Sequence, residues 1–131
     1  MSEYDGHSEF DRWFVDGVPG WDKNAEWNKE YLIQRQNWAN RELKINGYLT
    51  LNEVYQRIGF IRTTAGASAG WIYDPTRPDE DQIDFGLMDI RNADSVNLET
   101  KEWYLHFNIG TINVWNYVEP TKADLGRTVR W

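Results

Sequence analysis

The spacing of apolar residues changes once along this chain, and the change limits the folds that it can adopt. Four apolar residues recur at positions i, i+3, i+4 and i+7, the spacing of one helix face: Leu51, Val54, Tyr55 and Ile58. From Gly70 onward, apolar residues alternate with polar ones, as they do in half-buried strands. This order predicts an α+β fold, with two or three helices packed on an antiparallel sheet of about four strands.

Two helices are expected before the change in spacing. The first spans residues 25–45, and an Asn-Gly pair that readily adopts a left-handed conformation ends it. The second begins with a capping box, in which the side chains of Thr50 and Glu53 each bond the other residue's backbone N–H. Gly59 ends this second helix.

Three segments after the second helix are expected to be extended. Residues 70–74 form a short apolar strand, and residues 82–87 alternate apolar with polar side chains. A turn with two prolines and a run of charged residues separates these two segments. Residues 101–118 predict a hairpin, because Gly110 followed by Thr111 suits the tight turn that such hairpins use.

The length of 131 residues corresponds to one ordinary domain. We expect a single α+β domain at residues 25–118, between an acidic, aromatic N-terminal arm at residues 1–24 and a basic C-terminal arm at residues 119–131. The first residues lack the basic and apolar regions of a signal peptide. No run approaches the roughly 20 apolar residues of a membrane span, so membrane association is not expected.

The formal net charge of -7 restricts the partners that the chain is expected to bind. Affinity for nucleic acid comes mainly from Lys and Arg side chains that neutralise phosphates, so direct nucleic-acid binding is not expected. An acidic surface instead suits a basic protein partner. The sequence contains no cysteine, which excludes disulfides, thiolate metal sites and cysteine nucleophiles.

No motif in the sequence indicates catalysis. The chain has two histidines, and it contains neither a nucleophile elbow nor a phosphate-binding glycine loop. The acidic residues near position 80 lack the spacing of a calcium loop. We therefore predict no cofactor, no metal and no enzymatic activity. The alternative is a Mg-dependent nuclease using Asp84, Glu99 and Lys101, since such enzymes hold metal with two carboxylates and position water with a lysine.

The candidate binding residues are aromatic and acidic. The chain has eight Trp, seven Tyr and five Phe, and aromatic residues are enriched at protein interfaces. Five of them exceed what one small core readily absorbs: Trp13, Phe14, Trp21, Trp115 and Trp131. The aromatic residues of the arms either fold back to complete the core or bind a neighbour, which would be a second copy if the arms make a homo-oligomer. The residues predicted to bind a partner are Trp13, Phe14, Trp21, Asp79, Glu80, Asp81, Asp84, Trp115 and Trp131.

Several motifs occur in a fixed order between residues 37 and 115: GYLTLNEVY, RTTAG, GWIYD, IDFG and HFNI. This series resembles a family of small uncharacterised proteins from phages and prophages of Gram-positive bacteria. Some members of that family carry an N-terminal membrane segment, whereas an acidic aromatic arm stands there in this chain. The resemblance therefore implies a phage origin, without membrane attachment and without catalytic residues.

These observations together predict a phage-encoded, non-enzymatic protein that acts by binding another protein. The partner is expected to be either a neighbour in virion assembly or a host defence protein that is inhibited through the acidic surface. The expected location is the cytoplasm of the bacterial host or the virion itself.

Overall fold

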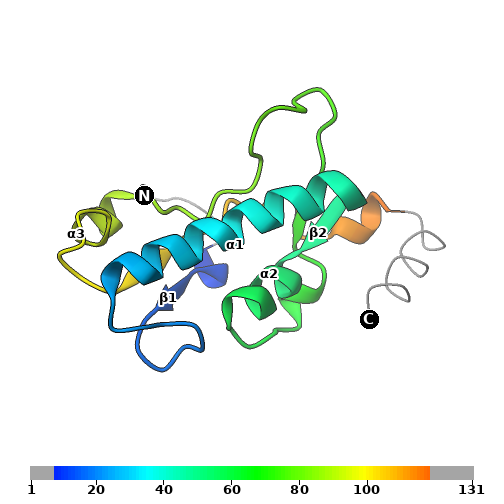
Figure 1. Ribbon diagram of the computed structural model, residues 1–131. Helices are drawn as coiled ribbons and strands as arrows, with labels where there is room; N and C mark the ends of the chain where they lie inside the picture. The colour runs from blue at the N-terminus through cyan, green and yellow to red at the C-terminus, as the bar shows by residue number, and fades with distance from the viewer. Residues whose placement is uncertain (1–7, 119–131) are drawn as a thin grey trace.

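A computed structural model of the protein describes residues 8–118. Within this range it has three α-helices and four short strands (Figure 1). Their bounds are β1 (Arg12–Phe14), α1 (Ala25–Asn46), β2 (Tyr48–Thr50), α2 (Leu51–Ile58), β3 (Gly70–Ile72), α3 (Ala93–Val96) and β4 (Trp103–Leu105). The predicted α+β fold is confirmed. The residues predicted to form the C-terminal arm, 119–131, lie outside the described range.

The four strands form two separate antiparallel pairs. Strand β1 pairs with β4, with Trp13 opposite Tyr104, and β2 pairs with β3, with Leu49 opposite Trp71. Helix α1 runs along the length of the molecule, with β1 near its N-terminal half and β2 near its C-terminal end (Figure 1). The strands therefore make two small sheets beneath one long helix, where the sequence predicted a single sheet of about four strands.

Both long helices begin and end where the sequence predicts. The Asn24 side chain accepts the Trp27 backbone N–H at the start of α1, and Gly47 ends the helix with a φ of 86°. The capping box of α2 is confirmed, because Thr50 N–H donates to Glu53 Oε2 at 2.9 Å and the Thr50 side chain accepts the Glu53 N–H.

The described part of the N-terminal segment, residues 8–24, contributes to the core. Phe10 and Phe14 are buried in the same hydrophobic cluster as the apolar residues of α1, α2 and β4. The hydroxyl of the buried Tyr55 on α2 donates to the Phe10 carbonyl at 2.6 Å. Burial of this side chain raises the pKa of Tyr55 to about 12. For Phe14, the structure shows that the side chain completes the core.

Residues 82–87 show the burial pattern that their alternation predicts. Ile83, Phe85 and Leu87 are buried, and the Asp84 side chain is exposed. The segment nevertheless forms no regular strand. Its carbonyl groups accept backbone N–H groups from the chain that follows β4, at His106 and Asn108.

Three N–H groups of the same segment donate to side-chain amides of α1. Asn40 Oδ1 accepts from the N–H groups of Gln82 and Ile83 at 2.8 and 2.9 Å. Gln36 Oε1, one turn earlier on the helix, accepts from the N–H of Phe85 at 2.9 Å. Two polar side chains on α1 therefore do for this segment what a neighbouring strand does in a sheet.

The predicted hairpin at residues 101–118 is wrong. Strand β4 pairs with β1, and residues 114–116 form a 3-10 turn that the Asn113 side chain caps. The backbone at residues 110–111 instead bonds to Gly70 at the start of β3. A β carbon at Gly70 would lie 2.1 Å from the Leu49 carbonyl oxygen, so the close approach of β2 and β3 requires glycine at this position. Strand β1, with its buried Phe14, has taken the place of the expected return strand.

Candidate functional site

The two-stranded sheet β1·β4 has one buried and one outward face. Phe14, Trp103 and Leu105 are buried on the inner side. Trp13 and Tyr104 lie opposite each other in the register and share the outer face. Their rings are 5.1 Å apart in an edge-to-face arrangement, which is a favoured geometry for aromatic pairs. The Trp13 side chain is 52% exposed.

A buried carboxylate holds the polar end of this face. The Asp11 side chain is only 4% exposed. It accepts the Tyr104 hydroxyl at 2.5 Å, and His106 Nδ1 lies 3.0 Å from its other oxygen. Burial, followed by the hydrogen bond and charge of Asp11, raises the pKa of Tyr104. Tyr104 is therefore fixed in position as a neutral phenol.

An arginine completes the outer face. The Arg91 guanidinium lies 4.0 Å from the centre of the Tyr104 ring, within the range of a cation–π contact. It also makes two parallel hydrogen bonds to the Asp89 carboxylate, at 2.9 and 2.8 Å. We call Trp13, Arg91 and Tyr104 the Trp13 patch. Each of the three side chains is oriented by a neighbour: Trp13 by Tyr104, Tyr104 by Asp11, and Arg91 by Asp89.

The hydrogen bond from Arg91 lowers the pKa of Asp89 from 3.8 to about 2. Because the pKa falls on folding, the Asp89–Arg91 pair stabilises the folded state above about pH 4. This contribution is lost as the pH falls toward about 2. We expect an NMR titration of the Asp89 carboxyl carbon to give a midpoint near 2, with the Arg91 Nε–H signal shifting in parallel. A midpoint near 3.8 would show that the pair does not hold Arg91 in place.

The Asp11–His106 pair also has a chemical interpretation. A carboxylate that orients an imidazole is part of many hydrolytic sites, which in addition need a nucleophile. Here the same carboxylate accepts the Tyr104 hydroxyl, so Tyr104 and His106 are both used in holding it. We assign this cluster to positioning the aromatic face.

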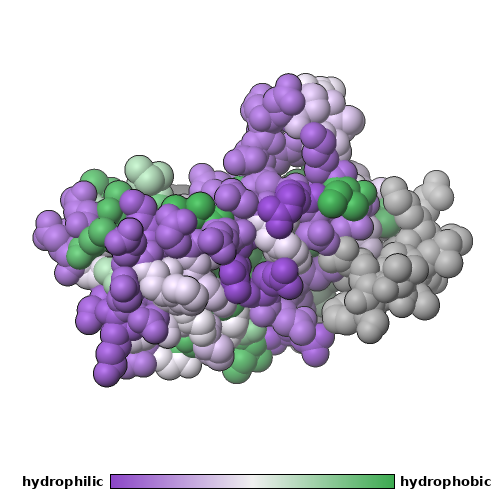
Figure 2. Space-filling view, in the orientation of Figure 1, coloured by the Kyte–Doolittle hydropathy of each residue, from purple (hydrophilic) through white to green (hydrophobic). Residues whose placement is uncertain are grey.

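Three of the four acidic residues predicted to bind a partner, all except Asp84, lie on a loop that projects from the body of the molecule (Figures 1 and 2). We call residues 74–82 the acidic loop. Its two ends are joined by one side chain, because Gln82 Oε1 accepts the Asp74 N–H at 2.9 Å and Gln82 Nε2 donates back to the Asp74 carbonyl at 3.0 Å. Three consecutive exposed carboxylates lie near the end of the loop: Asp79, Glu80 and Asp81.

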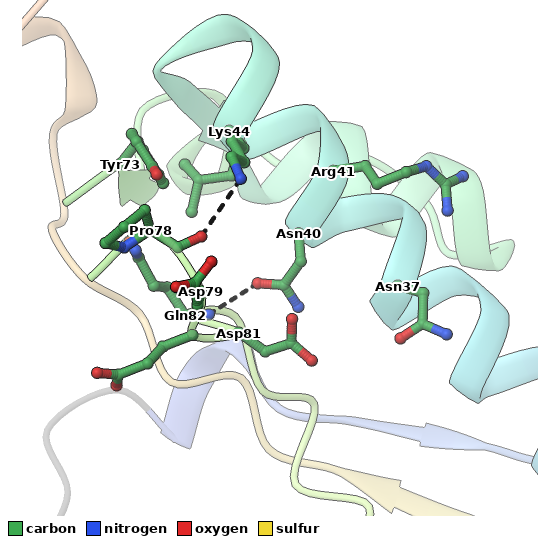
Figure 3. Close-up of a pocket in the computed structure, with 11 residues that line it drawn as sticks. Asn37, Asn40, Arg41, Lys44, Tyr73, Pro78, Asp79, Asp81 and Gln82 are labelled. Carbon is green, nitrogen blue, oxygen red and sulfur yellow. Dashed lines mark hydrogen bonds between the residues drawn. The ribbon is translucent and has the colours of Figure 1, made fainter. Parts of the chain in front are cut away.

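A pocket of about 390 Å³ separates the acidic loop from the C-terminal half of α1 (Figure 3). Lys44 bridges it by donating to the Pro78 carbonyl at 3.3 Å, and Asn40 reaches the backbone of Gln82. In Figure 3 the Arg41 side chain extends along the helix away from the loop. The loop is thus fastened to α1 by side-chain to backbone bonds at Pro78 and Gln82. Its three consecutive carboxylate residues line the mouth of the pocket and are exposed.

The remaining predicted residues take different positions. The Trp21 indole N–H donates to the Lys101 carbonyl at 3.0 Å, and its ring packs against the core. The Trp115 indole N–H donates to the Ala67 carbonyl at 3.1 Å, and 36% of the side chain is exposed. The exposed Asp84 carboxylate accepts the N–H of Gly86. Trp131 lies outside the described residues. The predicted binding residues therefore do not form one continuous surface.

No hydrogen bond or ion pair within the described residues joins the side chains of Asp84, Glu99 and Lys101, the residues of the nuclease alternative. Asp84 lies beside Asn108, whose N–H donates to the Asp84 carbonyl at 3.3 Å. Glu99 and Lys101 precede β4. Within residues 8–118, no three carboxylate or histidine side chains gather as metal ligands would.

Sequence reasoning identified Trp13 but missed the residues that position it. Tyr104 and His106 alternate along one strand, and Asp11 and Trp13 alternate along the other, so a signal for two outward faces was present. The pairing of the two segments joins residues 93 positions apart, and no local pattern encodes such a contact.

Three helices and two small antiparallel sheets make the described part of this chain a small α+β protein. None of its described helices combines the length and the apolar character that crossing a membrane requires. The chain belongs to a family of unknown function, DUF6353, whose model matches residues 4–118. Membership of an uncharacterised family, which the ordered motifs predicted, is thus confirmed. No curated protein and no solved structure matches the chain.

Proposed function

We propose that this chain is a non-enzymatic protein that binds another protein through the Trp13 patch. The main support for this proposal is that the half-exposed Trp13 lies on the outer face of the β1·β4 sheet together with Tyr104 and Arg91. Trp, Tyr and Arg are the residue types most enriched among those that dominate binding energy in protein interfaces.

The rigidity of the patch supports the same proposal. Asp11 holds the Tyr104 hydroxyl and Asp89 holds the Arg91 guanidinium, so two of the three side chains lose little further freedom on binding. Ordering of long side chains is one of the main costs of association, and a patch that is already ordered avoids much of it. Asp11 and Asp89 therefore have a role in binding without themselves being contact residues.

The acidic loop indicates which charge the proposed partner should carry. Its carboxylates project from the fold, and complementary charge raises association rates and excludes wrong partners more than it adds affinity. A basic surface on the partner fits this arrangement. The resemblance to phage and prophage proteins supports a partner in virion assembly or a host defence protein, in the bacterial cytoplasm or in the virion. A second copy of this chain is a further candidate, which would appear as a dimer.

A matched pair of tryptophans tests the proposal. Trp13 and Trp27 are each 52% exposed, but only Trp13 belongs to the patch. A tagged copy expressed in infected host cells identifies the partner by mass spectrometry, and the affinity of the purified pair is then measured by calorimetry. We expect Trp13→Ala to weaken binding at least about 30-fold, equivalent to about 2 kcal/mol. Trp27→Ala should change it by less than about 3-fold.

Circular dichroism of both variants controls for loss of fold. If Trp13→Ala binds as well as the unmodified protein, or if both variants lose affinity equally, the Trp13 patch is not the binding surface.

A further inference from the structure

A second pocket, of about 310 Å³, lies at residues of α1 and the last turn of α2, apart from the Trp13 patch. Its lining contains three arginines and no carboxylate: Gln34, Arg35, Asn37, Trp38, Arg41 and Arg57. We call this the arginine pocket. Such a grouping is unexpected in a chain with 21 acidic residues and a net charge of -7.

Within the described residues, the three guanidinium groups of the arginine pocket have no carboxylate at ion-pair distance. Among residues 8–118, none of Arg35, Arg41 and Arg57 forms an ion pair. Other arginines of the chain do have acidic partners, Arg77 with Glu80 and Arg91 with Asp89. Three like charges lining one pocket repel one another, and an anion bound between them would remove that repulsion.

Two of these arginines are held in place by aromatic rings. The Arg35 guanidinium lies 3.8 Å from the centre of the Tyr31 ring, and its Nε donates to the Arg57 carbonyl at 3.4 Å. The Arg57 guanidinium lies 4.7 Å from the centre of the Trp38 ring. A cation–π contact uses the charge of a guanidinium and leaves most of its N–H groups available as donors. Apart from Arg35 Nε, the guanidinium N–H groups of the pocket therefore have no acceptor among residues 8–118.

Basic and aromatic residues already alternate along residues 29–41 of the sequence. Folding adds Arg57 of α2 to this arrangement, because it meets Arg35 and Trp38 of α1. The addition of Arg57 could not be read from the order of residues, since it belongs to another helix.

We propose that the arginine pocket binds a phosphate group of a small organic or inorganic anion. A phosphate carries up to two negative charges and several acceptor oxygens, which suits three guanidiniums, whereas one carboxylate is satisfied by a single bidentate arginine. A volume of about 310 Å³ is at the lower end for small-molecule sites. It accommodates a phosphate with a small substituent and not a long polymer.

The test uses inorganic pyrophosphate as the probe, with the full chain in a low-salt buffer free of phosphate. Calorimetry should give saturable binding with one site per chain. The double variant Arg41→Gln with Arg57→Gln should weaken it at least about tenfold, since each change removes a charge-assisted contact. The control is Arg62→Gln, which removes one exposed positive charge outside the pocket and should change affinity by less than about twofold.

Three further probes distinguish the sources of the anion. Adenosine monophosphate should bind with affinity comparable to pyrophosphate, and the dicarboxylate succinate should bind at least about tenfold more weakly. A poly-thymidine oligonucleotide should gain nothing over the mononucleotide. The absence of saturable binding, equal binding of succinate, equal loss in the Arg62→Gln control, or binding by the oligonucleotide alone would each overturn the proposal. Thermal melting of the variants verifies that they are folded.

Discussion

Replacing Phe14 by alanine is expected to destabilise the protein by about 3–5 kcal/mol, the usual cost of removing a buried phenylalanine. The Phe14 side chain is fully buried, and its ring stacks on Tyr31 of α1 with centroids 5.6 Å apart. The substitution leaves a cavity where β1, β4 and α1 meet. Urea denaturation followed by Trp fluorescence measures the change in the free energy of unfolding.

The neighbouring residue gives the control for this prediction. Trp13 points to the opposite face of β1, so Trp13→Ala removes chiefly an aromatic pair, at a cost of about 1 kcal/mol. The two substitutions should therefore have different effects: Phe14→Ala should lower stability, and Trp13→Ala should chiefly weaken binding. Equal losses of stability in the two variants would mean that β1 does not pack as described.

Replacing Asn40 by leucine is expected to cost about 3 kcal/mol, although the side chain is similar in size and lies on a helix. Asn40 Oδ1 accepts two backbone N–H groups, those of Gln82 and Ile83, and Nδ2 donates to the Ile83 carbonyl at 3.0 Å. Leucine leaves all three groups without their partners, and each unmet group costs about 1–3 kcal/mol where water cannot replace the bond.

Asn37 provides a matched control for this second prediction. It lies on the same helix and is exposed, so Asn37→Leu should change the free energy of unfolding by less than about 0.5 kcal/mol. Hydrogen exchange supplies an independent measurement. In the unmodified protein the amide hydrogens of Gln82 and Ile83 should exchange slowly, and in Asn40→Leu they should exchange fast. A variant with unchanged exchange at both positions would contradict the assigned role of Asn40.

The parts of this fold that the sequence predicts are those determined within a few residues. The start of α2 depends on Thr50 and Glu53, three positions apart, and its buried face repeats within two turns. The alternation at residues 82–87 also gives the correct buried side chains. Such features need no knowledge of the rest of the chain, because both partners are local.

The parts that could not be predicted depend on contacts between distant residues. The second strand of a hairpin and an apolar 3-10 turn have similar composition. The composition of residues 112–118 therefore could not show that β4 would pair with β1 instead of with them. In the sequence, Asn40 likewise resembles an asparagine on the solvent-exposed side of a helix. Its role is seen only when the position of residues 82–87 is known. The same holds for the site: Trp13 was predicted, whereas Arg91 and Tyr104 became visible only once β1 and β4 were paired.

Side-chain amides of α1 take the place of a strand partner for residues 82–87, and this affects the chemical stability of the protein during storage. An asparagine that slowly loses its amide nitrogen by hydrolysis becomes an aspartate of almost the same shape, and asparagine is among the residues most sensitive to heat. At Asn40 this change would replace the donor to the Ile83 carbonyl by a second, negatively charged oxygen. A sheet whose strands bond backbone to backbone has no such weakness. Storage at high temperature should therefore loosen Gln82 and Ile83 from α1 while the two small sheets remain intact.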